Sequence, residues 1–99
     1  MKTKLNIIWS PLAEEIYLTI IKFILETWTN KEAMVFDKKV ESLITKLRAF
    51  KNLCPPSEIE KFLRRCVISK QTSLVYQIID NTTIELISFY DNRSNQNIR

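Results

Sequence analysis

The sequence has 99 residues, of which 45% are hydrophobic and 26% charged, and its net charge is +4. This composition is typical of one folded domain and excludes a disordered chain, which would carry fewer apolar side chains and a larger net charge. The chain has no histidine and no glycine, which excludes the commonest general base and any glycine-rich phosphate-binding loop. We therefore expect neither a metal nor a cofactor.

The apolar stretches point to a cytoplasmic protein. The longest, residues 16–28, includes Lys22 and Glu26 and is shorter than the roughly 20 residues that cross a bilayer. The N-terminal run is interrupted by polar residues and does not resemble a secretory signal. Cys54 and Cys66 are too few for a disulfide scaffold and lack a CxxC spacing, so in a reducing compartment we expect two buried free thiols.

The first predicted element is a short strand at residues 4–9, followed directly by a helix. Ser10 can cap that helix, and Pro11 suits its first position because the missing N–H costs nothing there. Helical spacing of apolar residues then continues to Trp28. The residues that carry this spacing are Ala13, Ile16, Ile20 and Ile24.

A second helix is predicted from the capping-box spacing of Thr29 and Glu32 to about Lys51. Two long helices joined by so short a connection form an antiparallel hairpin. Pro55 and Pro56 break the second helix, and residues 57–60 are expected to form one short turn.

The remaining sequence predicts three strands, at residues 62–69, 74–79 and 83–90. The middle strand is apolar on both faces and is expected to be central. The order is β-α-α-β-β-β, an α+β fold in which a helical hairpin packs on one face of a mainly antiparallel sheet. We expect a single domain over residues 1–99, with residues 94–99 as a flexible tail.

Basic residues gather on the predicted sheet. The stretch 61–79 contains no acid and could bind phosphates or an acidic partner. Alternatively, its charges protect an exposed strand edge from aggregation. Arg64 and Arg65 are adjacent in a strand and so point to opposite faces, and only one can join a given patch. The basic residues are Lys61, Arg64, Arg65 and Lys70, and Arg93 follows the last strand.

Few residues suit catalysis. No serine or cysteine lies beside an evident activating partner, and the acids at 14, 15, 58 and 60 are interpreted as charges at helix N-termini. If the protein cleaves RNA, arginine and lysine would stabilise charge at phosphorus while Tyr90, Asp91 or water handles protons. Tyr76 and Tyr90 could stack on bases, although aromatic residues in strands more often belong to the core.

Five strings occur along the chain in a distinctive order: WSPLAEE at the start of the first helix, A-x-x-F in the second, LRR in the first strand of the hairpins, SLVYQIID in the next, and FYDNR at the end. Their order and spacing resemble the RelE/ParE superfamily, the prokaryotic toxins of type II toxin–antitoxin (plasmid stabilisation) systems. The resemblance implies the fold inferred above and growth arrest. It also implies a cognate antitoxin that wraps the toxin with an acidic or amphipathic segment, in a homodimer or a toxin–antitoxin heterotetramer.

One branch of that superfamily, similar to RelE, cleaves messenger RNA on the ribosome. Arg64 and Arg93 match basic positions of this branch, whereas Cys66 and Ser73 stand where further basic residues are expected. The C-terminal proton carrier of the branch has no counterpart. If the chain is a ribonuclease, the resemblance leaves Arg64, Arg93 and Tyr90 as catalytic candidates.

The other branch, similar to ParE, poisons DNA gyrase without a recognised catalytic residue and favours a long helical hairpin. We expect the chain to follow this branch and not to be an enzyme. The residues expected to bind the target or the antitoxin are Arg64, Arg65, Lys70 and Arg93. For Arg93 the alternative is a solvated side chain paired with Asp91.

Two further expectations concern the target. If the helical hairpin is the targeting element, its solvent-facing lysines contact the target, among them Lys38, Lys39 and Lys46. The missing catalytic groups also allow a degenerate member that binds only its antitoxin.

Overall fold

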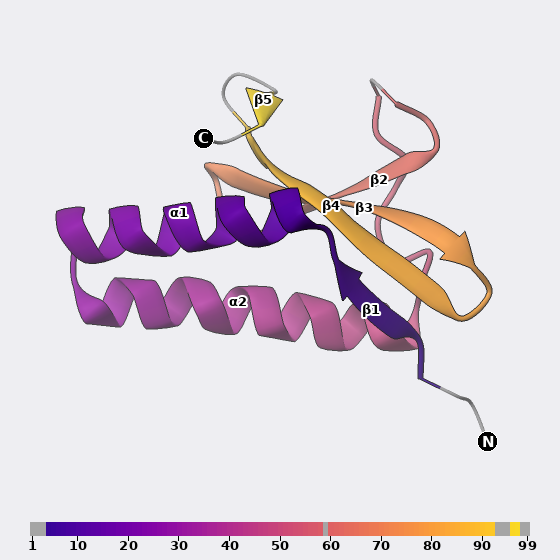
Figure 1. Cartoon of the computed structure of the whole chain (residues 1–99), viewed down its shortest axis with the longest axis horizontal. Helices are drawn as coiled ribbons and strands as arrows, with labels where there is room; N and C mark the ends of the chain where they lie inside the picture. The colour runs from indigo at the N-terminus through magenta and orange to yellow at the C-terminus, as the bar shows by residue number, and fades with distance from the viewer. Residues whose placement is uncertain (1–3, 59, 93–95, 98–99) are drawn as a thin grey trace.

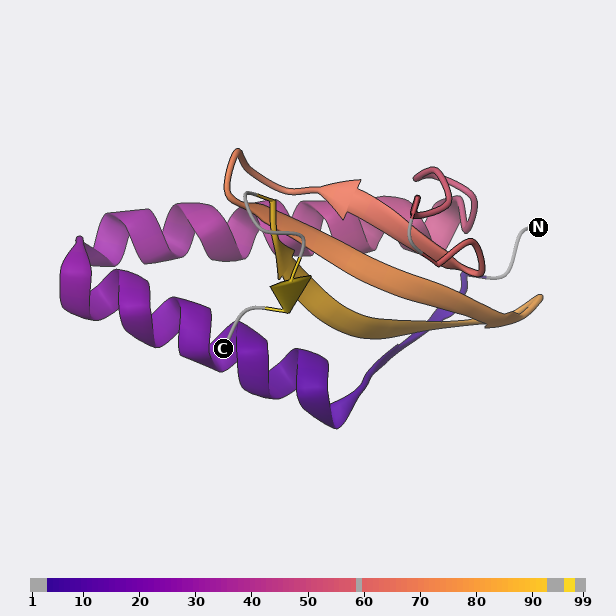
Figure 2. The same ribbon diagram turned by 90° about the horizontal axis from the view of Figure 1, so that it is seen from above.

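The computed structural model describes residues 4–58, 60–92 and 96–97. Two long helices lie side by side, and a twisted sheet covers one side of the pair (Figures 1 and 2). The elements are β1 (Asn6–Trp9), α1 (Pro11–Thr27), α2 (Asn30–Ala49), β2 (Leu63–Val67), β3 (Thr72–Asp80), β4 (Thr83–Asp91) and β5 (Gln96–Asn97). The α+β fold and the β-α-α-β-β-β order are confirmed, with β5 as an addition.

Both helices begin as their caps predict. The Ser10 hydroxyl accepts a hydrogen bond from the Ala13 N–H at 3.0 Å, which satisfies one of the free donors of the first turn. The Thr29 hydroxyl does the same for the Glu32 N–H at 3.2 Å. Helix α1 was expected to end at Trp28 and ends one residue earlier, at Thr27. Helix α2 was expected to end at about Lys51 and ends two residues earlier, at Ala49.

The sheet has the order β1-β4-β3-β2, with β5 pairing with β4. Strand β1 runs parallel to β4, and the other pairs are antiparallel, so the sheet is mainly antiparallel as predicted. Strand β3 lies between β2 and β4, which confirms its central position. Of residues 94–99 the structure describes Gln96 and Asn97, which pair with Asp91 and Tyr90.

Residues directly opposite each other on paired strands share a face of the sheet. Cys66, Leu74 and Phe89 lie opposite one another across β2, β3 and β4 and belong to the core beneath the helices. The other face is not covered by the helices and is here called the open face (Figures 1 and 2). It carries Arg65, Val75 and Ser88 and, nearer the end of the sheet, Ser73 and Tyr90. Of these, Arg65 and Tyr90 are half-buried and the other three are buried.

A register shift links β4 to the start of α1. Val75 pairs with Ser88 and Tyr76 with Leu86, so Ile87 is an extra residue in β4. The Ser10 hydroxyl donates to the Ile87 carbonyl at 2.8 Å. This hydrogen bond therefore holds the N-terminus of α1 against the bulge in β4.

The expectation of two free thiols is wrong, because Cys54 and Cys66 form a disulfide with Cα atoms 5.4 Å apart. The chain at residues 55–57 runs antiparallel beside β2: the Arg65 N–H donates to the Pro55 carbonyl at 3.1 Å, and the Ser57 N–H to the Leu63 carbonyl at 2.7 Å. This path brings Cys54 next to Cys66. Spacing along the sequence could not show it.

The described chain has a turn directly before β2, next to residues 57–60, where one short turn was expected and which include residue 59. The Leu63 N–H donates to the Glu60 carbonyl at 3.0 Å, so the turn spans residues 60–63 and leads directly into β2. Residue 59 lies outside the described ranges. Neither helix of the described chain is long and apolar enough to span a membrane.

Candidate functional site

Asn92, directly after β4, is the centre of a polar cluster at one end of the open face. Its Oδ1 atom accepts hydrogen bonds from Arg65 Nη2 at 2.9 Å and from the Ser73 hydroxyl. Its Nδ2 atom donates to the carbonyls of Ser69 and Lys70 at 3.0 and 3.1 Å. Its backbone N–H donates to the Gln71 carbonyl at 2.8 Å. We call Arg65, Ser73, Tyr90, Asn92 and the turn 69–71 the Asn92 cluster.

Arg65 crosses the open face to reach this cluster. Its guanidinium carbon lies 5.6 Å from the centre of the Tyr90 ring, a cation–π distance. Arg65 belongs to β2 and Tyr90 to β4, so the side chain passes over β3, where Ser73 lies opposite Tyr90. Because Ser73 is small, it leaves space for the guanidinium of Arg65. Ser73 is itself fully buried, and Arg65 and Ser73 both donate to the same oxygen of Asn92.

Arg64 lies elsewhere, as the alternation of a strand predicts. Its Nη1 atom donates to the Cys54 carbonyl at 2.6 Å, on the face opposite Arg65. The side chain is half-buried and holds the α2–β2 connection. The structure therefore separates Arg64 from Arg65 and Tyr90.

The other predicted site residues differ in what the structure shows of them. Lys70 is exposed on the β2–β3 turn, and its carbonyl accepts from Asn92. Lys61 is exposed before β2. Arg93 lies outside the described residues. Sequence reasoning did not single out Asn92, which lies two positions after the predicted strand 83–90 and within the string FYDNR.

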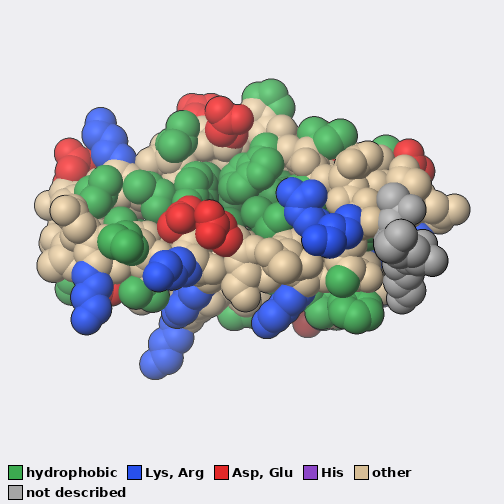
Figure 3. Space-filling view, turned by 90° about the horizontal axis from the view of Figure 1, so that it is seen from below, with side chains coloured by type: hydrophobic (Ala, Val, Ile, Leu, Met, Phe, Trp, Pro, Cys, Tyr) green, Lys and Arg blue, Asp and Glu red, His purple; other side chains and the backbone are tan. Residues whose placement is uncertain are grey.

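A second candidate site is a groove of ≈ 400 Å³ between α1, α2 and β1. Hydrophobic side chains gather in the hollow between the helices, with charged groups along its rim (Figure 3). Its apolar lining consists of Trp9, Val40 and Ile44, and its polar lining of Tyr17, Asp37, Glu41, Thr45 and Arg48.

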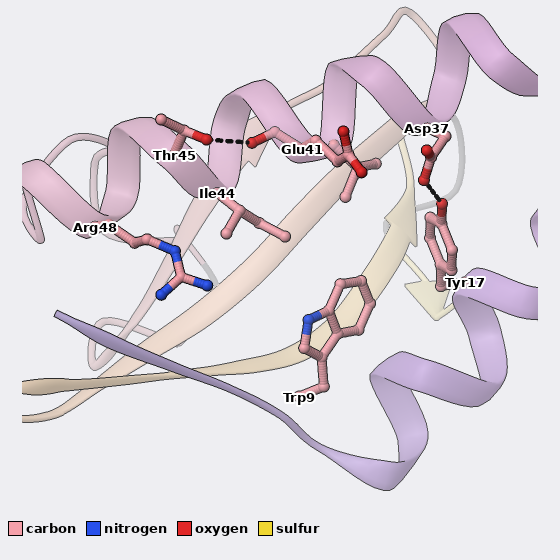
Figure 4. A pocket seen from close by; sticks show the side chains of 8 residues that line it. Trp9, Tyr17, Asp37, Glu41, Ile44, Thr45 and Arg48 are labelled. Carbon is pink, nitrogen blue, oxygen red and sulfur yellow. Dashed lines mark hydrogen bonds between the residues drawn. The ribbon is translucent and has the colours of Figure 1, made fainter. Parts of the chain in front are cut away.

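Tyr17 fixes one end of this groove. Its hydroxyl donates to the Asp37 carboxylate (Figure 4), and its ring contacts Trp9 edge-on with centroids 5.3 Å apart. Burial, and then the hydrogen bond to Asp37, raise the pKa of Tyr17 above its ordinary value. The phenol therefore stays neutral and keeps donating to Asp37.

The opposite end of the groove is basic. Arg48 projects from α2 toward β1 (Figure 4), and its Nη1 atom donates to the Leu5 carbonyl at 3.5 Å. The Leu5 N–H donates in turn to the Arg48 carbonyl at 3.1 Å. The groove thus has acidic groups on one side, a cation at one end and an apolar floor.

The joined ends of the helices extend beyond the sheet (Figure 1). Large apolar side chains are exposed there: Phe23 is 59% exposed, Trp28 66% and Met34 59%. We call these three residues the hairpin end. Lys38, Lys39 and Lys46 are exposed along α2.

Comparison with known proteins identifies the family. Residues 7–95 match the family described as the ParE toxin of type II toxin–antitoxin system, parDE. None of the curated proteins compared matches the sequence.

Among solved structures, the chain is similar to a structure of the chromosomal ParDE TA system from P. aeruginosa. The sequence identity is 13%, the TM-score is 0.73, and the alignment covers 97% of this chain and 98% of that chain. It is also similar to the YoeB/ParE toxin from Agrobacterium tumefaciens, with 14% identity, a TM-score of 0.65 and coverage of 89% and 99%. The YoeB dimer from Staphylococcus aureus gives 24% identity, a TM-score of 0.60 and coverage of 87% and 94%. At these identities the likeness shows a shared fold, and the match over residues 7–95 shows that the chain belongs to the ParE toxin family of type II toxin–antitoxin systems.

Proposed function

We propose that this protein is a cytoplasmic toxin that arrests growth by binding DNA gyrase and is neutralised by a cognate antitoxin. The observation that carries the proposal is the exposed hairpin end, with Phe23, Trp28 and Met34. Protein interfaces are enriched in aromatic residues and methionine, whereas nucleic-acid interfaces are more polar and basic. A surface of this kind therefore favours a protein target over RNA.

The Asn92 cluster supplies the polar part of the proposed target surface. The β2–β3 turn lies at the end of the sheet nearer the α1–α2 connection (Figures 1 and 2). One partner can therefore contact both the hairpin end and the cluster. We assign Arg65 and Lys70 to this surface, and Arg93, the residue that follows Asn92 in the sequence, belongs to the same proposal.

The groove between the helices is the proposed antitoxin site. Its apolar floor suits the apolar side of an amphipathic helix, and its charged rim suits that helix's polar flanks. Residues of both helices and of β1 line it, so an occupant would hold all three elements at once. Assembly as a homodimer or as a toxin–antitoxin heterotetramer belongs to the same proposal.

Pulse-labelling after induction, in a bacterial host without the antitoxin, tests this function. Thymidine incorporation should fall before methionine incorporation, and the purified protein should capture DNA gyrase. An early fall in methionine incorporation would contradict the proposal. No fall in either would indicate a degenerate member that binds only its antitoxin.

Messenger RNA cleavage remains a second candidate because of Arg65. The resemblance to the RelE branch expects an arginine at position 73, where this chain has serine. The guanidinium of Arg65 reaches the space beside that serine and lies near Tyr90, so a cation and a phenol do meet on the open face. Purified protein added to translating ribosomes would cut the messenger RNA if this candidate is correct.

A further inference from the structure

Asn92 uses every hydrogen-bonding position of its side-chain amide. An amide oxygen accepts two hydrogen bonds and its nitrogen donates two. Here Arg65 and Ser73 donate to the oxygen, while the carbonyls of Ser69 and Lys70 accept from the nitrogen. The reverse orientation would place an N–H group against the Arg65 guanidinium, which can only donate, and the oxygen against two carbonyls. The orientation of Asn92 is therefore fixed.

A fixed Asn92 limits the movement of Arg65. An arginine side chain normally loses much rotamer freedom when a partner binds it. Arg65 is already held by the Asn92 oxygen and lies over the Tyr90 ring. The Arg65 side chain has therefore lost much of its rotamer freedom before any partner binds.

The charge of the residue that holds Arg65 also affects what this surface can bind. Asn92 is neutral, so it orients the guanidinium without cancelling its charge. An aspartate at this position would also accept from Arg65, but it would neutralise the cation and lose the donors to Ser69 and Lys70. Asparagine therefore suits a surface that must present a positive charge in a set orientation.

We propose that Asn92 is a positioning residue of the target surface: it holds Arg65 over Tyr90 so that the guanidinium meets an acidic group of the protein partner in a preset orientation. This inference rests on the proposed function in one respect, that a partner binds the open face. Its geometric part concerns the toxin alone.

Nuclear magnetic resonance of the full-length protein tests the geometric part. The Tyr90 ring should shift the Arg65 side-chain resonances upfield in the wild type. Asn92→Ala should remove most of that upfield shift, whereas Asn92→Asp should retain it. Tyr90→Leu should also remove the shift, which would show that the Tyr90 ring is its source. Asn81→Ala is the matched control, because Asn81 accepts from Lys51 Nζ at 3.1 Å in the β3–β4 turn. Unchanged Arg65 resonances in Asn92→Ala would overturn the inference.

Binding to purified DNA gyrase tests the role in recognition. We expect Asn92→Ala and Asn92→Asp each to weaken binding about tenfold, the first by loss of orientation and the second by loss of charge. Because Asn92 acts through Arg65, the double variant Arg65→Ala/Asn92→Ala should bind no more weakly than Arg65→Ala alone. Additive losses would contradict the positioning role.

The two proposals fail in different ways. If Asn92→Ala removes the Arg65 shift while Arg65→Ala binds gyrase like the wild type, Asn92 still positions Arg65, but this face does not contact gyrase. If the shift persists while binding falls, the target surface is supported and the positioning inference is refuted.

Discussion

Cys54 and Cys66 are joined by a disulfide that fastens the α2–β2 connection to the edge strand of the sheet. Hydrogen bonds fix the same connection: the Tyr76 hydroxyl donates to the Lys51 carbonyl at 2.7 Å and accepts from the Cys54 N–H at 3.4 Å. Residues 55–57 cover the outer edge of β2. A covered edge cannot template pairing with another chain, so the disulfide stabilises a protected edge.

Replacing both cysteines by serine should lower the stability of the protein. A disulfide that closes a loop of about a dozen residues contributes roughly 2–3 kcal/mol through the unfolded chain. For a domain of this size each kcal/mol lowers the melting temperature by about 4–8 °C. Thermal unfolding with and without reductant measures this. Reductant should lower the melting temperature of the wild type but not that of Cys54→Ser/Cys66→Ser, and equal melting in all four samples would contradict the prediction.

Tyr17 should make stability depend on pH in the alkaline range. Burial and Asp37 raise the pKa of Tyr17 in the folded state, so the unfolded chain loses this proton at lower pH than the folded protein does. The stabilisation is complete below about pH 10, the ordinary tyrosine value, and decreases as the pH rises above it. Chemical denaturation on both sides of that pH should show a smaller decrease for Tyr17→Phe than for the wild type. The same decrease in both would exclude Tyr17 as the cause.

The fold could be predicted from the sequence because its signals are local. Ser10 and Thr29 mark helix starts through bonds to residues three positions ahead, and apolar spacing defines each element. Strand alternation also placed Arg64 and Arg65 on opposite faces. The disulfide could not be predicted, because it depends on the path of residues 55–57 beside a strand that lies later in the sequence.

The candidate site was predicted only in part, for the same physical reason. Arg65, Lys70 and Tyr90 were found from charge and residue type. Asn92 is neutral and bonds to residues 19 to 27 positions away, so no spacing pattern marks it. The groove between the helices likewise exists only after both helices and β1 have packed together.

The adjacent arginines should have separable roles. Arg64→Ala removes the hydrogen bond to the Cys54 carbonyl and should cost about 1–2 kcal/mol of stability without preventing growth arrest. Arg65→Ala removes the same charge, together with the hydrogen bond to Asn92 and the contact with the Tyr90 ring, so it should cost a similar amount of stability but should also abolish growth arrest. Induction in a host without antitoxin, together with thermal unfolding, compares the two. Loss of toxicity in Arg64→Ala alone would reverse the assignment.

Under the proposed function, the lysines of α2 should influence how fast the protein captures gyrase. Lys38, Lys39 and Lys46 are exposed, and charges at the rim of an interface mainly affect the association rate. Changing all three to glutamate should slow association at low salt, and high salt should reduce the effect. Changing them to glutamine should have a smaller effect, which separates loss of charge from its reversal. Equal association rates for all three proteins would direct attention to the sheet.

The hairpin end provides the sharpest test of a protein target. Trp28 is 66% exposed, so Trp28→Ala should change the melting temperature of the free protein little. In a complex, however, a buried aromatic anchor can contribute about 2 kcal/mol or more to binding, which is roughly a thirtyfold change in affinity. Phe62 is also 66% exposed but lies just before β2, which makes Phe62→Ala the matched control. We expect Trp28→Ala to weaken gyrase binding strongly and Phe62→Ala to leave it unchanged. Equal binding by both variants would show that the exposed apolar side chains of the hairpin end do not contact gyrase, and the target surface would then have to be sought at the Asn92 cluster alone.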